Sequence, residues 1–350
     1  MTSASIIASI NDLVERFDVQ LVRRSTYDPP LGWTDQHSNP ERLPPHASND
    51  LSPDHPRLRE LQHRYAELDC AATDHSAWTP EHVGREVNLR YFRADNGYVW
   101  QHRMTHFNLR YLLTAYYAKS TDRVGALASM AEDGMFGAAV FDFGDGTLLS
   151  RDTLDSCIEI NALDEAFGIT RTPGMSVLDI GAGYGRLAHR LANAVPSLSH
   201  VLCADAVPES TFLADYYLNF RGTGPKIRSV ALDEIDAELS RSPVDIATNI
   251  HSFSECTLGA ICWWLDLLAK HDVRYLFIAP NTDDTLLSTE RSGRRLDFEG
   301  EIERRGWKLR DKRPKFRNQH MQRNGVYPVH YFIFERVQNT HLWHGLTPST

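Results

Sequence analysis

The chain has 350 residues, 42% of them hydrophobic, and a formal net charge of −9. This length supports a full hydrophobic core and about two domains, and the negative charge argues against a protein that mainly binds nucleic acid. The sequence has no run of about 18 apolar residues, the length needed to span a bilayer. Its first residues do not resemble a secretory leader, and its five cysteines are too scattered for a disulfide framework. We therefore expect a cytoplasmic protein with small-molecule partners and neither nucleic acid nor membrane, and we leave open whether it forms a homo-oligomer.

The amino-terminal part is predicted to be a mainly helical accessory region with an irregular arm. Residues 25–56 hold seven of the 17 prolines, which favours an irregular arm over a core element. Beyond the arm, apolar residues recur twice at helical spacing. They are Leu58, Leu61, Tyr65 and Leu68 in the first stretch, and Met104, Phe107, Tyr111 and Leu112 in the second. Such stripes usually belong to a core, so we expect residues 1–150 to pack as a helical cap on the rest of the chain.

Residues 88–101 lie between these stretches and mix aromatic, arginine and amide side chains. Such a mixture suits the face and hydroxyl groups of a sugar. An ordinary strand and turn, with the turn at Asp95, Asn96 and Gly97, fits the segment equally well. Both interpretations stay open at this point.

A new organisation begins near residue 150. Ser150 can cap a helix whose apolar positions include Leu154, Ile158 and Leu163 and which reaches Phe167. This helix leads directly into an apolar strand. We therefore divide the chain into an accessory region, residues 1–150, and a second domain, residues 151–350.

The most informative segment is residues 176–185, an aliphatic strand that reaches Asp179 and then turns on Gly181, Gly183 and Gly185. Glycine permits a positive φ and lets the backbone approach a ligand, while the free N–H groups of the following helix attract polar groups. Gly181, Ala182, Gly183 and Gly185 are thus expected to hold a nucleotide-type cofactor. A dinucleotide fingerprint would read Gly-x-Gly-x-x-Gly, whereas this loop reads Gly-x-Gly-x-Gly.

A second apolar strand, residues 200–204, ends at Asp205, twenty residues after Gly185. An acid at that place can accept both hydroxyls of a ribose, and Ala206 next to it would lie against the same ligand. A glycine-rich structural turn is the plainer alternative. The ordered set of strand, acid, glycines, helix and second acid favours the cofactor site.

Alternating strands and helices continue to the end of the chain. Residues 226–231, 244–250 and 275–279 are predicted strands, with a helix over residues 211–220. Residues 307–310 and 329–335 close the pattern as two further strands. The pattern predicts a parallel, doubly wound α/β sheet.

In such a sheet ligands bind beyond the carboxyl ends of the strands, so the residues that follow them are candidates for chemistry. Asp233 follows the third predicted strand and is expected near the adenine ring, although a surface acid would fit as well. Asn249 is expected to contact the cofactor, and His251 and Glu255 are the candidate catalytic residues. Histidine can take a proton near neutral pH, and Glu255 could orient it or bind a metal.

The segment from Asp179 to Gly185, with Asp205, resembles motif I and the second acid of class I S-adenosylmethionine (SAM)-dependent methyltransferases. Together with residues 92–101 and 251–255, it resembles a bacterial family of sugar O-methyltransferases over roughly residues 85–335. The proline-rich arm departs from that family. The resemblance implies a Rossmann-like, seven-stranded methyltransferase sheet, SAM as cofactor and a substrate-capping accessory region.

The same resemblance implies transfer of a methyl group to a hydroxyl of a sugar or oligosaccharide, with methylmannose polysaccharide assembly as one setting. Some sugar methyltransferases also need Mg²⁺, which takes oxygen ligands. Candidate ligands are Glu255, Asp283, Asp284, Asp142 and Asp145, and their spacing selects no metal set. The metal site is therefore unknown from the sequence.

Several other functions remain to be distinguished. They are a methyltransferase acting on a non-sugar secondary metabolite, a nicotinamide oxidoreductase, and a non-catalytic methyltransferase-like scaffold. A serine hydrolase is disfavoured because Ser252 and Ser254 lack the flanking glycines of a nucleophile elbow.

Overall fold

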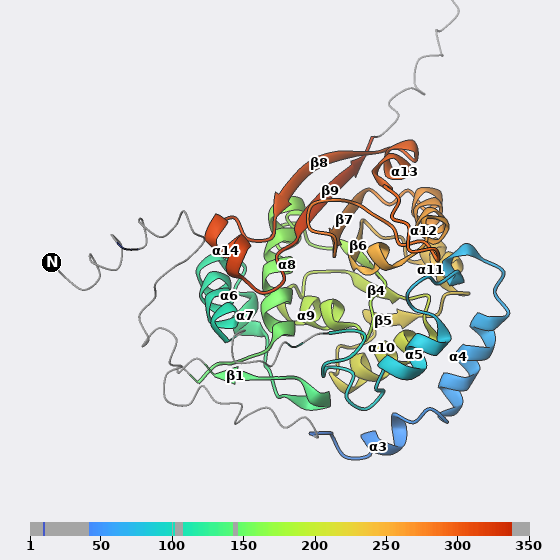
Figure 1. Cartoon of the computed structure of the whole chain (residues 1–350), viewed down its shortest axis with the longest axis horizontal. Helices are drawn as coiled ribbons and strands as arrows, with labels where there is room; N and C mark the ends of the chain where they lie inside the picture. Colours follow the sequence, from blue (N-terminus) through green and yellow to red (C-terminus); the bar gives the residue numbers. More distant parts are fainter. Residues whose placement is uncertain (1–9, 11–41, 100, 102–107, 143–145, 338–350) are drawn as a thin grey trace, which may run out of the picture.

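The computed structural model describes residue 10 and residues 42–99, 101, 108–142 and 146–337 (Figure 1). Four expectations fall on other residues: most of the proline-rich arm, Met104 and Phe107 of the second apolar stripe, and the candidate metal ligand Asp145 lie outside the described residues. Within the described residues, no helix has the length and apolar character needed to cross a membrane.

The centre of the protein is a seven-stranded sheet with the order β5-β4-β3-β6-β7-β9-β8. Strands β3 to β7 run parallel, whereas β9 pairs antiparallel with both β7 and β8. The strands are β3 (Ser176–Ile180), β4 (His200–Ala204), β5 (Ile227–Val230), β6 (Ile246–His251), β7 (Tyr275–Pro280), β8 (Trp307–Pro314) and β9 (His330–Arg336). The predicted α/β fold, a Rossmann-like seven-stranded sheet of the methyltransferase type, is confirmed.

Helices cover both faces of this sheet because its central strands are apolar on both sides. Val177 and Leu178 are neighbours on β3, yet they belong to different hydrophobic clusters, since successive side chains of a strand point to opposite faces. One cluster includes α8 and α9, and the other includes α11 and α12. The helices of this part are α8 (Arg151–Phe167), α9 (Arg186–Ala194), α10 (Pro208–Phe220), α11 (Ile235–Arg241), α12 (Leu258–Lys270), α13 (Glu299–Arg304) and α14 (Gln319–Asn324), with the 3₁₀ helix η6 (Ser252–Glu255).

Helix α8 begins and ends as its sequence predicts. Ser150 is its N-cap: the Ser150 hydroxyl accepts from the Thr153 N–H, and the Thr153 side chain reaches back to the Ser150 N–H. Gly168 follows the helix with a φ of 69°, which ends it. The cap fixes the first turn of α8, whose side chains line the site described below.

The amino-terminal region combines short helices with turns. Its elements are α3 (Ala47–Asp50), α4 (Pro56–Ala66), η3 (Ala71–Thr73), α5 (Pro80–Glu86), α6 (Asn108–Thr121), α7 (Ala126–Ser129), η5 (Met135–Gly137), β1 (Phe141–Asp142) and β2 (Leu148–Leu149). The helix predicted from the first apolar stripe is α4, which buries Leu58, Leu61 and Tyr65, while Leu68 follows it. Residues 88–99 and 101 contain no strand, so the strand that one interpretation expected here is absent. The turn of this segment lies at Phe92 and Arg93, and Asp95, Asn96 and Gly97 form a bend.

This region packs directly on the sheet domain. Figure 1 shows α4 beside α10, and α6 and α7 beside α8 and α9, in agreement with their residue contacts. Phe92 and Phe136 stack with ring centroids 4.7 Å apart and join the same hydrophobic cluster as Tyr184 of the glycine loop. The division near residue 150 stays a prediction, because residues on both sides of it share the same hydrophobic clusters.

Candidate functional site

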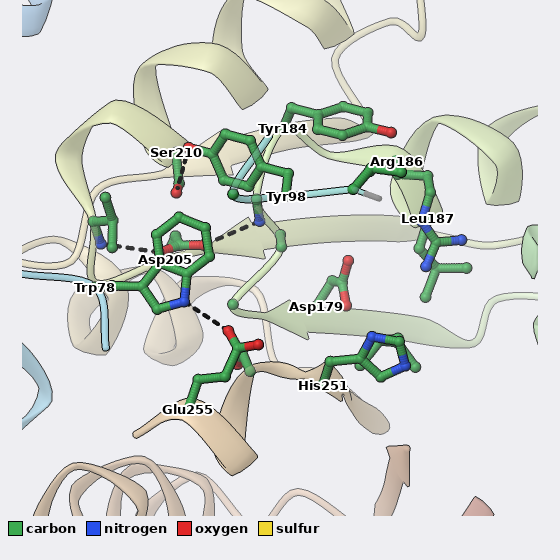
Figure 2. Close-up of a pocket in the computed structure, with 18 of the residues that line it drawn as sticks. Trp78, Tyr98, Asp179, Tyr184, Arg186, Leu187, Asp205, Ser210, His251 and Glu255 are labelled. Carbon is green, nitrogen blue, oxygen red and sulfur yellow. Dashed lines mark hydrogen bonds between the residues drawn. The ribbon is translucent and has the colours of Figure 1, made fainter. Parts of the chain in front are cut away.

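A cavity of about 240 Å³ lies at the carboxyl ends of β3, β4 and β6 (Figure 2). Both parts of the chain contribute to it. Its lining includes His75, Trp78, Tyr98, Arg151, Asp152, Asp155, Asp179, Gly181, Ala182, Gly183, Tyr184, Arg186, Asp205, Ala206, Ser210, His251, Ser252, Glu255, Cys256 and Tyr327. Ligands of doubly wound sheets bind at this end of the strands, so the cavity lies at the edge of the sheet where the sequence predicts a ligand site.

The glycine loop needs glycine for its backbone and for its close neighbours. Gly181 and Gly183 have φ values of 66° and 56°, which favour glycine. A Cβ atom at position 181 would overlap the Ser252 side chain, and one at position 183 would lie 3.2 Å from the Tyr98 ring. Gly185 is the N-cap of α9 and packs against Leu218 rather than facing the cavity. Of the predicted loop contacts, Gly181, Ala182 and Gly183 line the cavity and Gly185 does not.

Asp205 follows β4 and fixes the glycine loop. Its Oδ2 accepts from the Gly183 N–H at 3.0 Å and its Oδ1 accepts from the Val207 N–H at 2.9 Å. The Ser210 side chain and the Ala206 backbone N–H also donate to this carboxyl, so most of its roughly four acceptor positions are used within the protein. Burial raises the pKa of Asp205 to about 6.

Asp179, the last but one residue of β3, is 4% exposed and lines the cavity next to the loop. The Thr248 hydroxyl donates to Asp179 Oδ1 at 2.7 Å. Burial raises the pKa of Asp179 to about 7, because little solvent remains to stabilise its charge. The group can therefore exist in either protonation state near neutral pH.

Two predicted cofactor contacts lie elsewhere. Asp233 is not among the lining residues: both of its oxygens accept from Arg64 of α4, at 2.6 and 2.8 Å, and the ion pair holds the amino-terminal region on the sheet domain. Asn249 also lies behind the cavity. Its amide donates to Ile180 O and Ser252 Oγ and its Oδ1 accepts from the Phe253 N–H, so it joins the ends of β3 and β6. The expectations that Asp233 and Asn249 face the cofactor are corrected accordingly.

His251 ends β6 with a φ of 71°, an uncommon value for a residue other than glycine. Its ring lies against Tyr327, with 4.9 Å between the ring centroids. Burial and the nearby Arg151 guanidinium lower the pKa of His251 to about 3. The imidazole is therefore neutral near pH 7 and is a weak base.

Glu255 ends η6 and faces the same cavity from a different direction. Its Oε2 accepts from Trp78 Nε1 at 2.6 Å and its Oε1 accepts from Asn281 Nδ2 at 2.9 Å. Burial raises the pKa of Glu255 above its usual range. Figure 2 shows the His251 ring turned away from Glu255, and neither a hydrogen bond nor an ion pair joins these two residues, both of which are described. The predicted orientation of His251 by Glu255 is thus absent here.

Two aromatic residues of the amino-terminal region cover the glycine loop. Trp78 and Tyr98 stack with 5.3 Å between centroids, and the Tyr98 hydroxyl is 2.9 Å from Ser210 Oγ. Figure 2 shows the Tyr98 ring above Asp205 and the Trp78 ring in front of it. Tyr98 belongs to the segment whose composition suggested a sugar site, whereas no pattern in the sequence singled out Trp78.

The metal candidates are spread over the protein. Asp283 pairs with His330 and Asp284 with Lys312, away from the cavity, and Asp142 belongs to the β1–β2 hairpin. Among the described residues, no group of three or more His, Cys, Asp or Glu side chains is arranged to hold a metal ion. The expectation of Mg²⁺ gains no support from these residues.

Acidic groups outnumber basic groups around the cavity. The carboxyl groups in its lining belong to Asp152, Asp155, Asp179, Asp205 and Glu255, and the guanidinium groups to Arg151 and Arg186. Arg186 is neutralised by Glu159, which lies 2.7 Å away, and Arg151 by Asp155, 3.1 Å away. Such a lining favours cationic over anionic ligands.

Comparison with solved structures returns several methyltransferases among its matches. Magnesium protoporphyrin IX methyltransferase of Synechocystis PCC 6803, solved with bound SAM, matches with 14% identity and a TM-score of 0.37, over 53% of this chain and 83% of that one. TrmN of Thermus thermophilus matches with 21% identity and a TM-score of 0.35, over 54% of this chain, which spans about half (49%) of TrmN. Precorrin-6y C5,15-methyltransferase of Geobacter metallireducens matches with 15% identity and a TM-score of 0.34, over 49% and 85% of the two chains.

No protein-family model and no curated protein matches this chain. Because the TM-scores and identities of the structural matches are low, the fold assignment rests on the strand order and on the antiparallel position of β9.

Proposed function

We propose that this protein is a SAM-dependent O-methyltransferase that acts on a hydroxyl group of a sugar or oligosaccharide. The assignment of SAM as methyl donor rests on the loop of Gly181 to Gly185 between β3 and α9. This loop is joined through the Gly183 N–H to Asp205 at the end of β4. The loop and the acid face one cavity at the carboxyl edge of a seven-stranded sheet. The sugar acceptor has weaker support, which comes from side chains around that cavity.

The charge of the cavity favours SAM over a nicotinamide dinucleotide. SAM carries a sulfonium cation, whereas the pyrophosphate of NAD is anionic and would meet Asp205, which is ionised above its pKa of about 6. The spacing Gly-x-Gly-x-Gly also departs from the dinucleotide fingerprint. When bound, SAM would supply an electrophilic methyl group.

The residues present fit the two ends of such a donor. Asp205 lines the cavity and would accept from ribose hydroxyls in place of the Ser210 hydroxyl, and Ala206 and Val207 follow it along the cavity wall. The Tyr98 ring lies directly on Gly183, so close that a Cβ atom there would be 3.2 Å from it. Because Trp78 stacks on Tyr98, the two rings either flank the nucleoside or shift when it enters.

A sugar acceptor is supported by the mixture of aromatic and carboxyl groups in the lining. Trp78, Tyr98 and Tyr327 offer ring faces, and Glu255 offers hydrogen-bond acceptors. Aromatic faces and carboxylates together match the C–H faces and hydroxyls of a sugar. A non-sugar metabolite with a phenolic hydroxyl is the second candidate, and the same aromatic residues favour it.

Methyl transfer to a hydroxyl needs the acceptor to be held in line and its proton to be removed. Of the two predicted catalytic residues, Glu255 is the stronger base, because burial raises its pKa whereas burial lowers the pKa of His251 to about 3. We therefore assign proton removal to Glu255. His251 would position the substrate by accepting a hydrogen bond, through its neutral ring, from a neighbouring hydroxyl of the sugar.

Binding calorimetry tests the donor half of the proposal. S-adenosylhomocysteine, the product of methyl transfer, should bind at one site per chain, and NAD should not bind. Binding of NAD alone, or of neither ligand, would overturn the proposed function and leave a scaffold or an oxidoreductase as the explanation.

Turnover tests the acceptor half. The protein is incubated with methyl-labelled SAM and separate panels of monosaccharides, oligosaccharides and phenols, and label transfer is counted. Sugars should be methylated, and Glu255→Gln should lower turnover by about 100-fold or more while S-adenosylhomocysteine affinity is retained. His251→Asn should have a smaller effect. The reverse order of these two effects would return proton removal to His251, and transfer to phenols alone would reject the sugar acceptor.

A further inference from the structure

One carboxylate oxygen of the cavity lining has no hydrogen-bond partner. Asp152 is 2% exposed, and its Oδ2 accepts from Arg93 Nε at 2.8 Å and from the Tyr184 hydroxyl at 2.6 Å. Its Oδ1 is buried and makes no hydrogen bond in the part of the chain that the structure describes. Asp152 nevertheless lines the cavity. A buried carboxylate oxygen without a partner is costly, so a ligand with a suitable donor would be stabilised there.

The surroundings hold this oxygen in place. Asp152 lies in the first turn of α8, two residues after the capping residue Ser150. Arg93 is completely buried between Asp152 and Glu132. Its Nη2 donates to Glu132 Oε2 at 2.7 Å. The Ser150 hydroxyl donates to the same Glu132 oxygen. Because these contacts fix Oδ2, the carboxylate cannot turn to satisfy Oδ1 without losing two short hydrogen bonds.

Asp152 lies at the opposite end of the glycine loop from Asp205. Gly183 donates its N–H to Asp205, while the next residue, Tyr184, donates its hydroxyl to Asp152. Figure 2 shows the Tyr184 hydroxyl directed away from Asp205. A nucleoside whose ribose reaches Asp205 would therefore extend its other end along the loop toward Asp152.

We propose that Asp152 Oδ1 accepts a hydrogen bond from the α-ammonium group at the amino-acid end of the methyl donor. This inference rests on the proposed function. Among the groups of the donor, the sulfonium has no N–H or O–H, and the α-carboxylate would be repelled by Asp152. The ribose hydroxyls belong to the Asp205 end. The α-ammonium is a charged group with three donors, and it matches an unpaired carboxylate oxygen in both charge and hydrogen-bonding role.

Two ligands and two variants test this assignment by calorimetry. S-adenosylhomocysteine carries the amino-acid end, whereas 5′-methylthioadenosine lacks it. Asp152→Asn keeps the shape and can still accept from Arg93 and Tyr184, but it presents no charge to the cavity. We expect Asp152→Asn to weaken S-adenosylhomocysteine binding by about 10–100-fold and to leave 5′-methylthioadenosine binding within about 3-fold.

Glu132→Gln is the matched control. Glu132 is buried in the same network and contacts Arg93, but it does not line the cavity. Its change should alter the two affinities by the same factor. Equal losses of both ligands in Asp152→Asn, or no loss of either, would overturn the inference and leave the proposed function intact. Failure of the unaltered protein to bind either ligand would instead reject the proposed function, and the inference with it.

A measurement on the unaltered protein covers the case in which Asp152→Asn does not fold. The desamino analogue of S-adenosylhomocysteine lacks only the α-ammonium group. It should bind about 10-fold or more weakly than S-adenosylhomocysteine. Equal affinities would show that neither Asp152 nor any other protein group binds the α-ammonium favourably, and this result would overturn the inference.

Discussion

The sheet domain and the amino-terminal region bring residues to the same cavity by different physical means. Asp179 and Asp205 are fixed by strands β3 and β4, which pair in register along their length. Trp78 and Tyr98 lie in turns and are fixed by a ring stack and by single hydrogen bonds to Glu255 and Ser210. Strands that pair through their backbones have a repeating sequence pattern that predicts them. Single side-chain contacts between distant segments have no such pattern.

Buried charge reinforces this difference. Arg93 of the amino-terminal region is completely buried and pairs with Glu132 and Asp152, while Asp179 of the sheet is buried with only a neutral hydroxyl as its partner. The Arg93 cluster is stable only when its groups are ionised, because the positive and negative charges compensate each other. Asp179, which has no cationic partner of this kind, is more stable as a protonated carboxyl. The variants below test this difference between the two buried sites.

Removal of the Arg93 charge should have the largest effect. Arg93→Met leaves Asp152 buried without its cation and Glu132 with Arg190 alone, and we expect the free energy of unfolding to fall by about 3–5 kcal/mol. Arg59→Met, which removes an exposed pair with Asp54, should lower it by about 0.2–1 kcal/mol. Urea unfolding of both variants measures the difference. Similar losses would mean that the buried pairs do not hold the amino-terminal region in place.

Adding a methyl group to the glycine loop should have the second largest effect on stability. Gly181→Ala should lower the free energy of unfolding by about 3 kcal/mol, because it adds an overlap with Ser252 to an unfavourable positive φ. It should also abolish S-adenosylhomocysteine binding. Gly224→Ala is the control, since Gly224 has a similar φ of 77° and nothing within 4 Å of the added Cβ. A loss of only about 1 kcal/mol is expected there, and equal losses would contradict the close approach to Ser252.

The pKa of Asp179 gives the stability a pH dependence. Between the unfolded pKa of about 3.9 and the folded pKa of about 7, only the folded state keeps this proton, so raising the pH over that window destabilises the fold. Asp179→Asn keeps the bond from Thr248 and removes the titration. Its unfolding free energy should decline less steeply with pH, by up to about 1.4 kcal/mol for each pH unit. Parallel profiles from pH 4.5 to 7 would show that Asp179 is charged in the folded protein.

The smallest effect is expected at Tyr98. Tyr98→Phe removes the 2.9 Å hydrogen bond to Ser210 and keeps the ring on Trp78 and Gly183, which should cost about 0.5–1.5 kcal/mol. Tyr116→Phe, at a residue that is 63% exposed, should change stability by less than about 0.5 kcal/mol. Thermal unfolding compares the two. A loss above that of Arg93→Met would reverse the ranking of the contacts that hold the amino-terminal region.

The sequence predicts the strands and the residues at their ends well. The segment around Asp179 and the Ser150 cap follow local rules of pattern and capping, and the structure bears them out. Asp233 and Asn249 show where these rules stop, because a position after a strand does not determine where a side chain points. Asp233 turns outward to Arg64, and Asn249 turns back to the end of β3.

Residues far apart in the chain were beyond prediction. Trp78 meets Glu255 across 177 positions, and Arg93 meets Asp152 across 59, without any repeating pattern that would reveal either contact. The pKa shifts of His251 and Glu255 also follow from burial by other segments. Their catalytic ranking therefore depended on the assembled structure.

The strand order makes this protein vulnerable to early termination of its synthesis. Strand β9 is made after β8 but lies between β7 and β8. A premature stop codon just before His330 would remove one strand and leave β8 without its partner in the sheet. The open flank of β7 would then present unpaired backbone groups to other chains, and such a truncated product should aggregate.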